Sequence, residues 1–119
     1  MKRNRIGLNY ALNGLKIALT QEYNFRIHLI VLVITVFAGL VVDLSRIEWL
    51  WIIIAGGFVV TLELINSVIE MITDVLFPDY DSIAKRIKDI SAAAVLTSSI
   101  TAMLIGIIIF VPKIWTSLI

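Results

Sequence analysis

The strongest constraint on the fold of this chain is a run of 22 residues without a formal charge, from Ile90 to Val111. About 20 apolar residues in a helix are enough to cross the hydrocarbon of a bilayer. A second uncharged run, with one histidine, covers residues 27–42, and a third apolar run extends from Trp49 to Leu76 with only acidic interruptions. Hydrophobic residues make up 60% of the chain, against about 45–50% in soluble domains. The sequence therefore predicts an all-α membrane protein.

We interpret the chain as one membrane domain, residues 1–119, with transmembrane helices over about 25–43, 48–76 and 83–112. Before the first span, Leu8, Leu12, Leu15 and Leu19 recur at helical spacing. This pattern predicts an amphipathic helix over about 4–22 that lies on the membrane surface.

Basic residues are concentrated before the first span and between the second and third spans. The connection between the first two spans contains only Arg46. The positive-inside rule therefore predicts a multi-pass protein of the cell membrane, with a cytoplasmic N-terminus and a C-terminus outside. No basic tract is long enough to follow a phosphate backbone, so a nucleic-acid partner is not expected. The basic residues that decide this orientation are Lys2, Arg3, Arg5, Lys16, Arg26, Lys85, Arg86 and Lys88.

The second span carries a polar stripe. At 100° per residue, Glu63, Asn66, Glu70 and Asp74 fall within an arc of roughly 80°. Glu63 lies about 21 Å along the helix from Trp49, in a hydrocarbon layer of about 30 Å. A carboxylate near mid-membrane costs on the order of 2.5–3.5 kcal/mol, which favours a functional site. The alternative is that the stripe only joins helices by hydrogen bonds.

A second polar cluster precedes the third span. Asp81 or Ser82 is the expected N-cap, which places Lys85 and Arg86 in the first turns of the helix. Cations are unfavourable at a helix N-terminus, so they indicate an anionic ligand such as phosphate. The alternative is that these residues only satisfy topology and lipid headgroups. Lys88 is expected to meet the Glu70 end of the stripe.

The two clusters together carry a resemblance. E-L-I-N-S-V-I-E-M-I-T-D at 63–74, followed by A-K-R-I-K-D-I-S-A-A-A-V at 84–95, resembles the signature of the small bacterial membrane lipid kinases, the diacylglycerol kinase and undecaprenol kinase family. The similarity covers nearly the whole chain. Neither G-x-x-x-x-G-K-[ST] nor a Gly-rich kinase loop is present, so use of ATP follows from the resemblance alone.

The resemblance implies a role for each matching residue. Glu63 would be the general base that takes the proton from the lipid hydroxyl, and Asn66 would orient the base or the phosphate. Glu22 and Glu70 would hold Mg²⁺ together with the phosphates of ATP. Arg3 would lie near the lipid, Asp74 has no assigned role, and His28 is interpreted as an interfacial side chain without a catalytic part. The residues expected to bind the nucleotide are Tyr10, Glu22, Glu70, Asp79, Tyr80, Asp81, Lys88 and Asp89.

Three function classes remain open from the residues themselves. The family resemblance predicts an ATP- and Mg²⁺-dependent lipid kinase, with undecaprenol as the expected acceptor and diacylglycerol as the alternative. A small proton- or cation-conducting subunit would use the acidic stripe as a relay, and a scaffold would do neither. Three short spans offer little core to one protomer, so an oligomer is expected, and the family implies a homotrimer with shared active sites.

Overall fold

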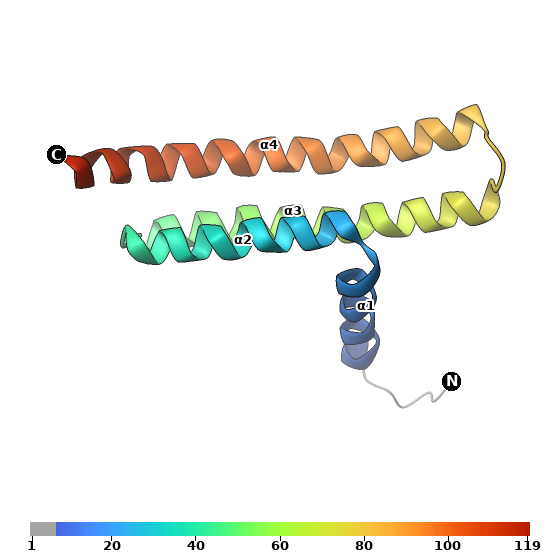
Figure 1. Ribbon diagram of the computed structural model, residues 1–119, viewed down its shortest axis with the longest axis horizontal. Helices are drawn as coiled ribbons and strands as arrows, with labels where there is room; N and C mark the ends of the chain where they lie inside the picture. Colours follow the sequence, from blue (N-terminus) through green and yellow to red (C-terminus); the bar gives the residue numbers. More distant parts are fainter. Residues whose placement is uncertain (1–6) are drawn as a thin grey trace.

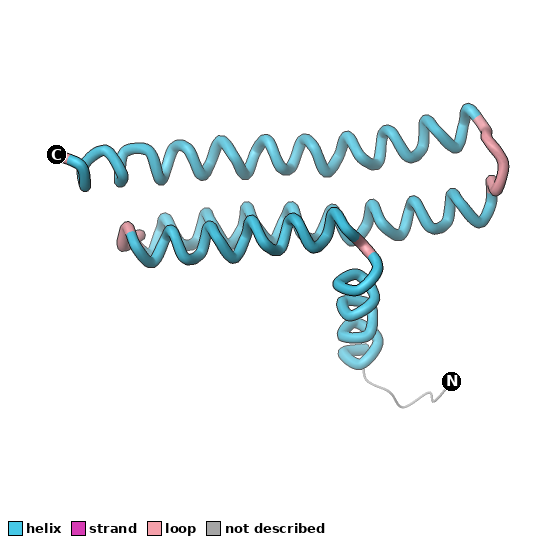
Figure 2. The backbone as a smooth tube through the Cα atoms, viewed as in Figure 1, coloured by secondary structure: helices cyan, strands magenta, loops and turns pink. Residues whose placement is uncertain are grey.

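The computed structural model describes residues 7–119, which are helical apart from short connections (Figures 1 and 2). The helices are α1 (Gly7–Gln21), α2 (Tyr23–Val41), α3 (Arg46–Leu76) and α4 (Ser82–Leu118). Three of them, α2, α3 and α4, are long and apolar enough to cross a membrane. The prediction of an all-α protein with three spans is therefore confirmed.

The helices α3 and α4 form a long antiparallel hairpin (Figure 1). Helix α2 lies alongside α3, which packs more extensively against α4 than against α2. Helix α1 leaves the start of α2 and runs crosswise to the bundle (Figure 1). Its leucines, Leu8, Leu12, Leu15 and Leu19, are exposed. Binding of α1 to a membrane surface stays a prediction.

Both hairpin helices are longer than the hydrocarbon layer of a bilayer. Helix α3 has 31 residues and α4 has 37, or about 46 Å and about 55 Å against about 30 Å. Helix α4 runs through Pro112 to Leu118, beyond the expected transmembrane span of about 83–112. A proline removes one backbone donor and crowds the carbonyl four residues earlier, but two hydroxyls of the next turn bond to the Lys113 carbonyl and support that turn.

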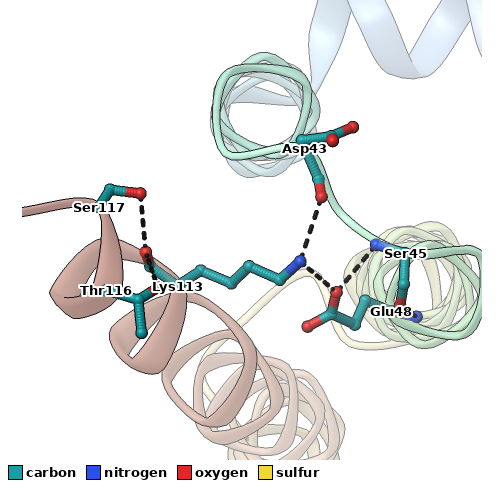
Figure 3. Close-up of polar contacts among 6 residues, drawn as sticks. All are labelled: Asp43, Ser45, Glu48, Lys113, Thr116 and Ser117. Carbon is teal, nitrogen blue, oxygen red and sulfur yellow. Dashed lines mark hydrogen bonds and ion pairs between the residues drawn. The ribbon is translucent and has the colours of Figure 1, made fainter.

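A polar tie closes the end of the bundle where α2 connects to α3 (Figure 3). Ser45 begins α3 with a capping box, in which the Glu48 carboxylate accepts from the Ser45 backbone N–H at 2.8 Å. Lys113 of α4 pairs with Glu48 at 2.9 Å and donates to the Asp43 carbonyl at 3.1 Å. We call these four residues the Lys113 clasp. It joins α4 to α3 and to the connection between α2 and α3.

Apolar packing supports the same end. Leu44, Ile52 and Ile109 form a buried core cluster beside Trp49. Gly39 on α2 allows this packing, because a Cβ at that position would lie 2.7 Å from the Trp49 ring. The tight contact therefore fixes the end of α2 against the start of α3.

The junction between α1 and α2 is fixed by an arginine. Glu22 occupies the N-cap position of α2 in an extended conformation, and its side chain does not cap the helix. Arg26 Nη1 donates to the Leu19 carbonyl at 3.0 Å, which satisfies an end group of α1. The carboxylate of Glu22 is thus free of local helix capping.

Candidate active site

The polar stripe of α3 runs from the interior of the bundle to its surface. Glu63 is 3% exposed and Asn66 is 5% exposed, although both lie in an apolar helix. Glu70 is partly buried, and Asp74 is exposed. The stripe therefore joins a buried carboxylate to the loop end of the α3–α4 hairpin.

Glu63 is approached from a neighbouring helix by a histidine. His28 Nε2 on α2 lies 3.5 Å from Glu63 Oε2. The interpretation of His28 as an interfacial side chain omits this contact, and nothing in the sequence relates position 28 to position 63.

Asn66 connects the stripe to α4. Its Nδ2 donates to Glu70 Oε1 at 3.1 Å, and its Oδ1 accepts from Ser91 Oγ at 2.6 Å. Both ends of the buried amide are therefore satisfied, which holds Glu70 in one orientation. We define Glu63, Asn66, Glu70, His28 and Ser91 as the Glu63 cluster.

A pocket of about 380 Å³ opens at the loop between α3 and α4. Its wall includes Thr73 and Asp74 of α3 and Lys85 of α4. The structure thus gathers at one place most of the residues that the resemblance assigns to the nucleotide. Those in the wall are Asp79, Tyr80, Asp81, Lys88 and Asp89.

Ion pairs form among the residues of the pocket wall. Lys88 Nζ of α4 lies 2.7 Å from Asp74 Oδ1 of α3, so Lys88 meets the stripe at its Glu70 end, where Asp74 is its partner. Asp89 pairs with Lys85 at 2.6 Å. Asp81 is the N-cap of α4, as expected, and accepts from two backbone N–H groups. Asp74, which had no assigned role, is thereby the acidic partner of Lys88.

The remaining predicted residues lie elsewhere. Tyr10 is an exposed residue of α1 and is not part of the pocket wall, and Glu22 lies at the α1–α2 junction. Arg3 lies outside the described residues. Within residues 7–119, no three carboxylate, imidazole or thiol groups come together as a metal site.

A second cavity, of about 370 Å³, lies between α2, α3 and α4. Its wall is mostly apolar and includes His28 and Thr35 of α2 and Gly56 of α3. Ser99 of α4 also lines it, with a buried hydroxyl that has no hydrogen-bond partner. Because His28 touches both this cavity and Glu63, the cavity is adjacent to the Glu63 cluster.

Three span-length helices, a buried carboxylate and a charged pocket at one end of the bundle define an integral membrane protein with an enzyme-like polar site. Residues 9–110 match the family described as prokaryotic diacylglycerol kinase. The chain belongs to this family and is a lipid kinase. Among the three function classes, that of a lipid kinase is thereby confirmed.

Characterised relatives agree with this assignment. The chain is 36% identical to undecaprenol kinase of Bacillus subtilis over 92 residues, which cover 77% of this chain and 75% of that protein. It is 31% identical to a diacylglycerol kinase of Synechocystis over 108 residues, 90% of this chain and 62% of that protein. It is 30% identical to diacylglycerol kinase of Escherichia coli K12 over 95 residues, 80% of this chain and 78% of that protein.

Proposed function

We propose that the protein transfers the γ-phosphoryl group of ATP to the hydroxyl of undecaprenol at the cytoplasmic membrane face, with Glu63 as general base. The observation that carries this proposal is the burial of an ionisable carboxylate, Glu63, on a membrane-spanning helix that leads to a charged pocket. Undecaprenol is favoured as the acceptor because the Bacillus subtilis relative, which is 36% identical to this chain, is named undecaprenol kinase.

The proposed reaction transfers one proton to Glu63 and one phosphoryl group to the lipid. The Glu63 carboxylate takes the proton of the lipid hydroxyl while the hydroxyl oxygen forms a bond to the γ-phosphorus of ATP. The bond between that phosphorus and the β–γ bridging oxygen breaks, and ADP is released. Asn66, held by Glu70 and Ser91, keeps the neighbouring carboxylate in place. Burial of Glu63 excludes water, which would otherwise compete as the acceptor.

The carboxylates of Glu22 and Glu70 fit Mg²⁺. They are hard oxygen donors from different segments, and Mg²⁺ usually takes one or two carboxylates plus substrate phosphates. One Glu70 oxygen accepts from Asn66, while Glu22 is free of helix capping. When bound, Mg²⁺ would neutralise charge that develops on the phosphates.

The α3–α4 loop pocket is the proposed nucleotide site. The ammonium group of Lys88 would bind phosphate oxygens, and Asp89 would act with it. Asp79, Tyr80 and Asp81 would contact the rest of the nucleotide, and the pocket already brings these side chains together. Tyr10 would join them from α1, and Arg3 would lie near the acceptor lipid.

We also propose a homotrimer, with the N-terminus in the cytoplasm and the C-terminus outside. Large apolar side chains are exposed on all three span-length helices, so a single protomer offers wide surfaces for both lipid and other protomers. Tyr10 does not line the nucleotide pocket of its own protomer. A neighbouring protomer could supply it, as the resemblance implies.

The decisive experiment measures transfer of labelled γ-phosphate to extracted lipid, with undecaprenol and diacylglycerol offered separately to reconstituted protein. We expect lipid-dependent transfer with a higher kcat/KM for undecaprenol. A higher value for diacylglycerol would favour the activity that the Synechocystis and Escherichia coli relatives carry in their names. An absence of transfer to either lipid would overturn the proposal.

A further inference from the structure

The contact between His28 and Glu63 suggests a role for His28 in the proposed reaction, and this inference rests on the proposed function. The imidazole belongs to α2, and the carboxylate belongs to α3. Their side chains are 23% and 4% exposed, and Nε2 lies 3.5 Å from Oε2. A buried carboxylate that faces an imidazole across two helices is an arrangement that packing alone does not require.

The backbone of α2 is fixed close to this contact. Phe25, one turn before His28, is 1% exposed and anchors the first turns of the helix. Arg26 ties the same turns to the end of α1 through the Leu19 carbonyl. His28 is therefore presented to Glu63 from a well-held segment, which is what a site of defined geometry needs.

Within residues 7–119, His28 is the side chain from another helix that pairs with the Glu63 carboxylate. Asn66, one turn along the same helix, also acts on this carboxylate, but its amide is bonded to Glu70 and to Ser91 as well. Glu70, two turns along the same face of α3, carries the same charge and cannot hold the Glu63 carboxylate in one orientation. His28 is the group from another helix that can attract it.

We propose that His28 is a positioning residue that holds the Glu63 carboxylate in the orientation needed to take the proton from the acceptor hydroxyl. The distance of 3.5 Å is longer than the usual hydrogen-bond range of about 2.7–3.2 Å, so the role requires the imidazole to move closer to Glu63 when the acceptor binds. With its proton on Nε2, His28 donates to Oε2 and leaves Oε1 for the substrate. His28 also borders the apolar cavity, so it lies where the cavity meets the base.

This role predicts a specific pattern of kinetics. A misplaced base slows the chemical step, whereas ATP binds in a pocket that does not include His28. His28→Leu is expected to lower kcat about 10- to 100-fold, with the KM for ATP changed by less than about twofold. His28→Gln restores a donor at the place of Nε2, so it is expected to recover most of this loss.

The control variant is Thr35→Val. Thr35 is on the same helix and lines the same cavity, but its hydroxyl bonds to the Val31 carbonyl of its own helix. This near-isosteric change is expected to leave kcat within about twofold of wild type. The measurements are steady-state lipid phosphorylation and thermal unfolding of each purified variant.

A folded His28→Leu enzyme with wild-type kcat would overturn the proposal, and so would equal losses in His28→Leu and His28→Gln. If His28→Leu does not fold, His28→Asn replaces it, because the shorter amide cannot reach the position of Nε2. Asn and Gln variants of equal kcat would then contradict a positioning role. Failure of the wild-type protein to phosphorylate any lipid would count against the proposed function and is seen before any variant is compared.

Discussion

Two glutamates of α3 face a basic side chain from another helix, but the two pairs differ in construction. In the Lys113 clasp, Glu48 accepts from the Ser45 backbone and pairs with Lys113 at 2.9 Å (Figure 3). In the Glu63 cluster, the carboxylate meets His28 at 3.5 Å and is almost fully buried. One carboxylate is well satisfied near the surface, and the other is poorly satisfied in the interior.

This difference indicates that the Lys113 clasp stabilises the fold and that the Glu63 cluster serves catalysis. A partly exposed and fully bonded pair costs little and ties helices together. A buried carboxylate with a weak partner costs several kcal/mol, so its presence indicates a site where reactivity matters more than stability. Changes in the Lys113 clasp should therefore act on unfolding, and changes in the Glu63 cluster should act on catalysis.

The largest contrast is expected between Glu70→Gln and Glu48→Gln. Loss of the Glu70 charge removes a proposed Mg²⁺ ligand, so kcat should fall about 100- to 1,000-fold, and the Mg²⁺ concentration for half-maximal rate should rise. Glu48→Gln makes the same chemical change in the clasp and should keep kcat within about twofold. Phosphorylation rates measured across a Mg²⁺ titration check both. Unchanged Mg²⁺ dependence in Glu70→Gln would exclude Glu70 as a ligand.

A second contrast compares two buried serines of α4. Ser91→Ala removes the donor to Asn66 Oδ1, and a buried unsatisfied oxygen should lower the free energy of unfolding by about 1–3 kcal/mol. It should also lower kcat several-fold, because Asn66 then holds Glu70 less firmly. Ser98 is buried more deeply but bonds to a carbonyl of its own helix, so Ser98→Ala should leave kcat unchanged. Equal kcat losses in the two variants would mean that the hydrogen bond between Ser91 and Asn66 does not contribute specifically to catalysis.

The smallest effect is expected from Lys113→Met. Loss of the bonds to Glu48 and to the Asp43 carbonyl should lower the free energy of unfolding by about 1 kcal/mol, with kcat within about twofold of wild type. Lys113→Arg, which keeps the charge, should recover part of the stability. Thermal unfolding in detergent and steady-state rates test this pair. A fall in rate without a fall in melting temperature would mean that the clasp acts on the site.

The helices could be predicted from the sequence because uncharged runs of this length leave little choice in a bilayer. Their ends were less certain. The third span was expected over about 83–112, whereas α4 continues through Pro112 to Leu118, where two hydroxyls bond back to the Lys113 carbonyl. The Ser45–Glu48 capping box has a sequence signature, S-x-x-E, that could have marked the start of α3.

For the site, relations within one helix could be predicted, and relations between helices could not. The 3.6-residue period places Glu63, Asn66 and Glu70 on one face without any knowledge of packing. The contacts of His28 with Glu63 and of Ser91 with Asn66 depend on how far each helix is shifted along its neighbour. The periodicity of one helix does not determine how far it is displaced along its neighbour, so these partners could be identified only from the folded structure.

The role of Glu63 is tested most directly by the rate of phosphoryl transfer to lipid in Glu63→Gln, measured beside ATP binding by the same preparation. We expect kcat about 100- to 10,000-fold below wild type while ATP still binds, because the amide cannot take the proton and Glu63 lies outside the nucleotide pocket. A Glu63→Gln enzyme that phosphorylates lipid at the wild-type rate would contradict the assignment of Glu63 as the base.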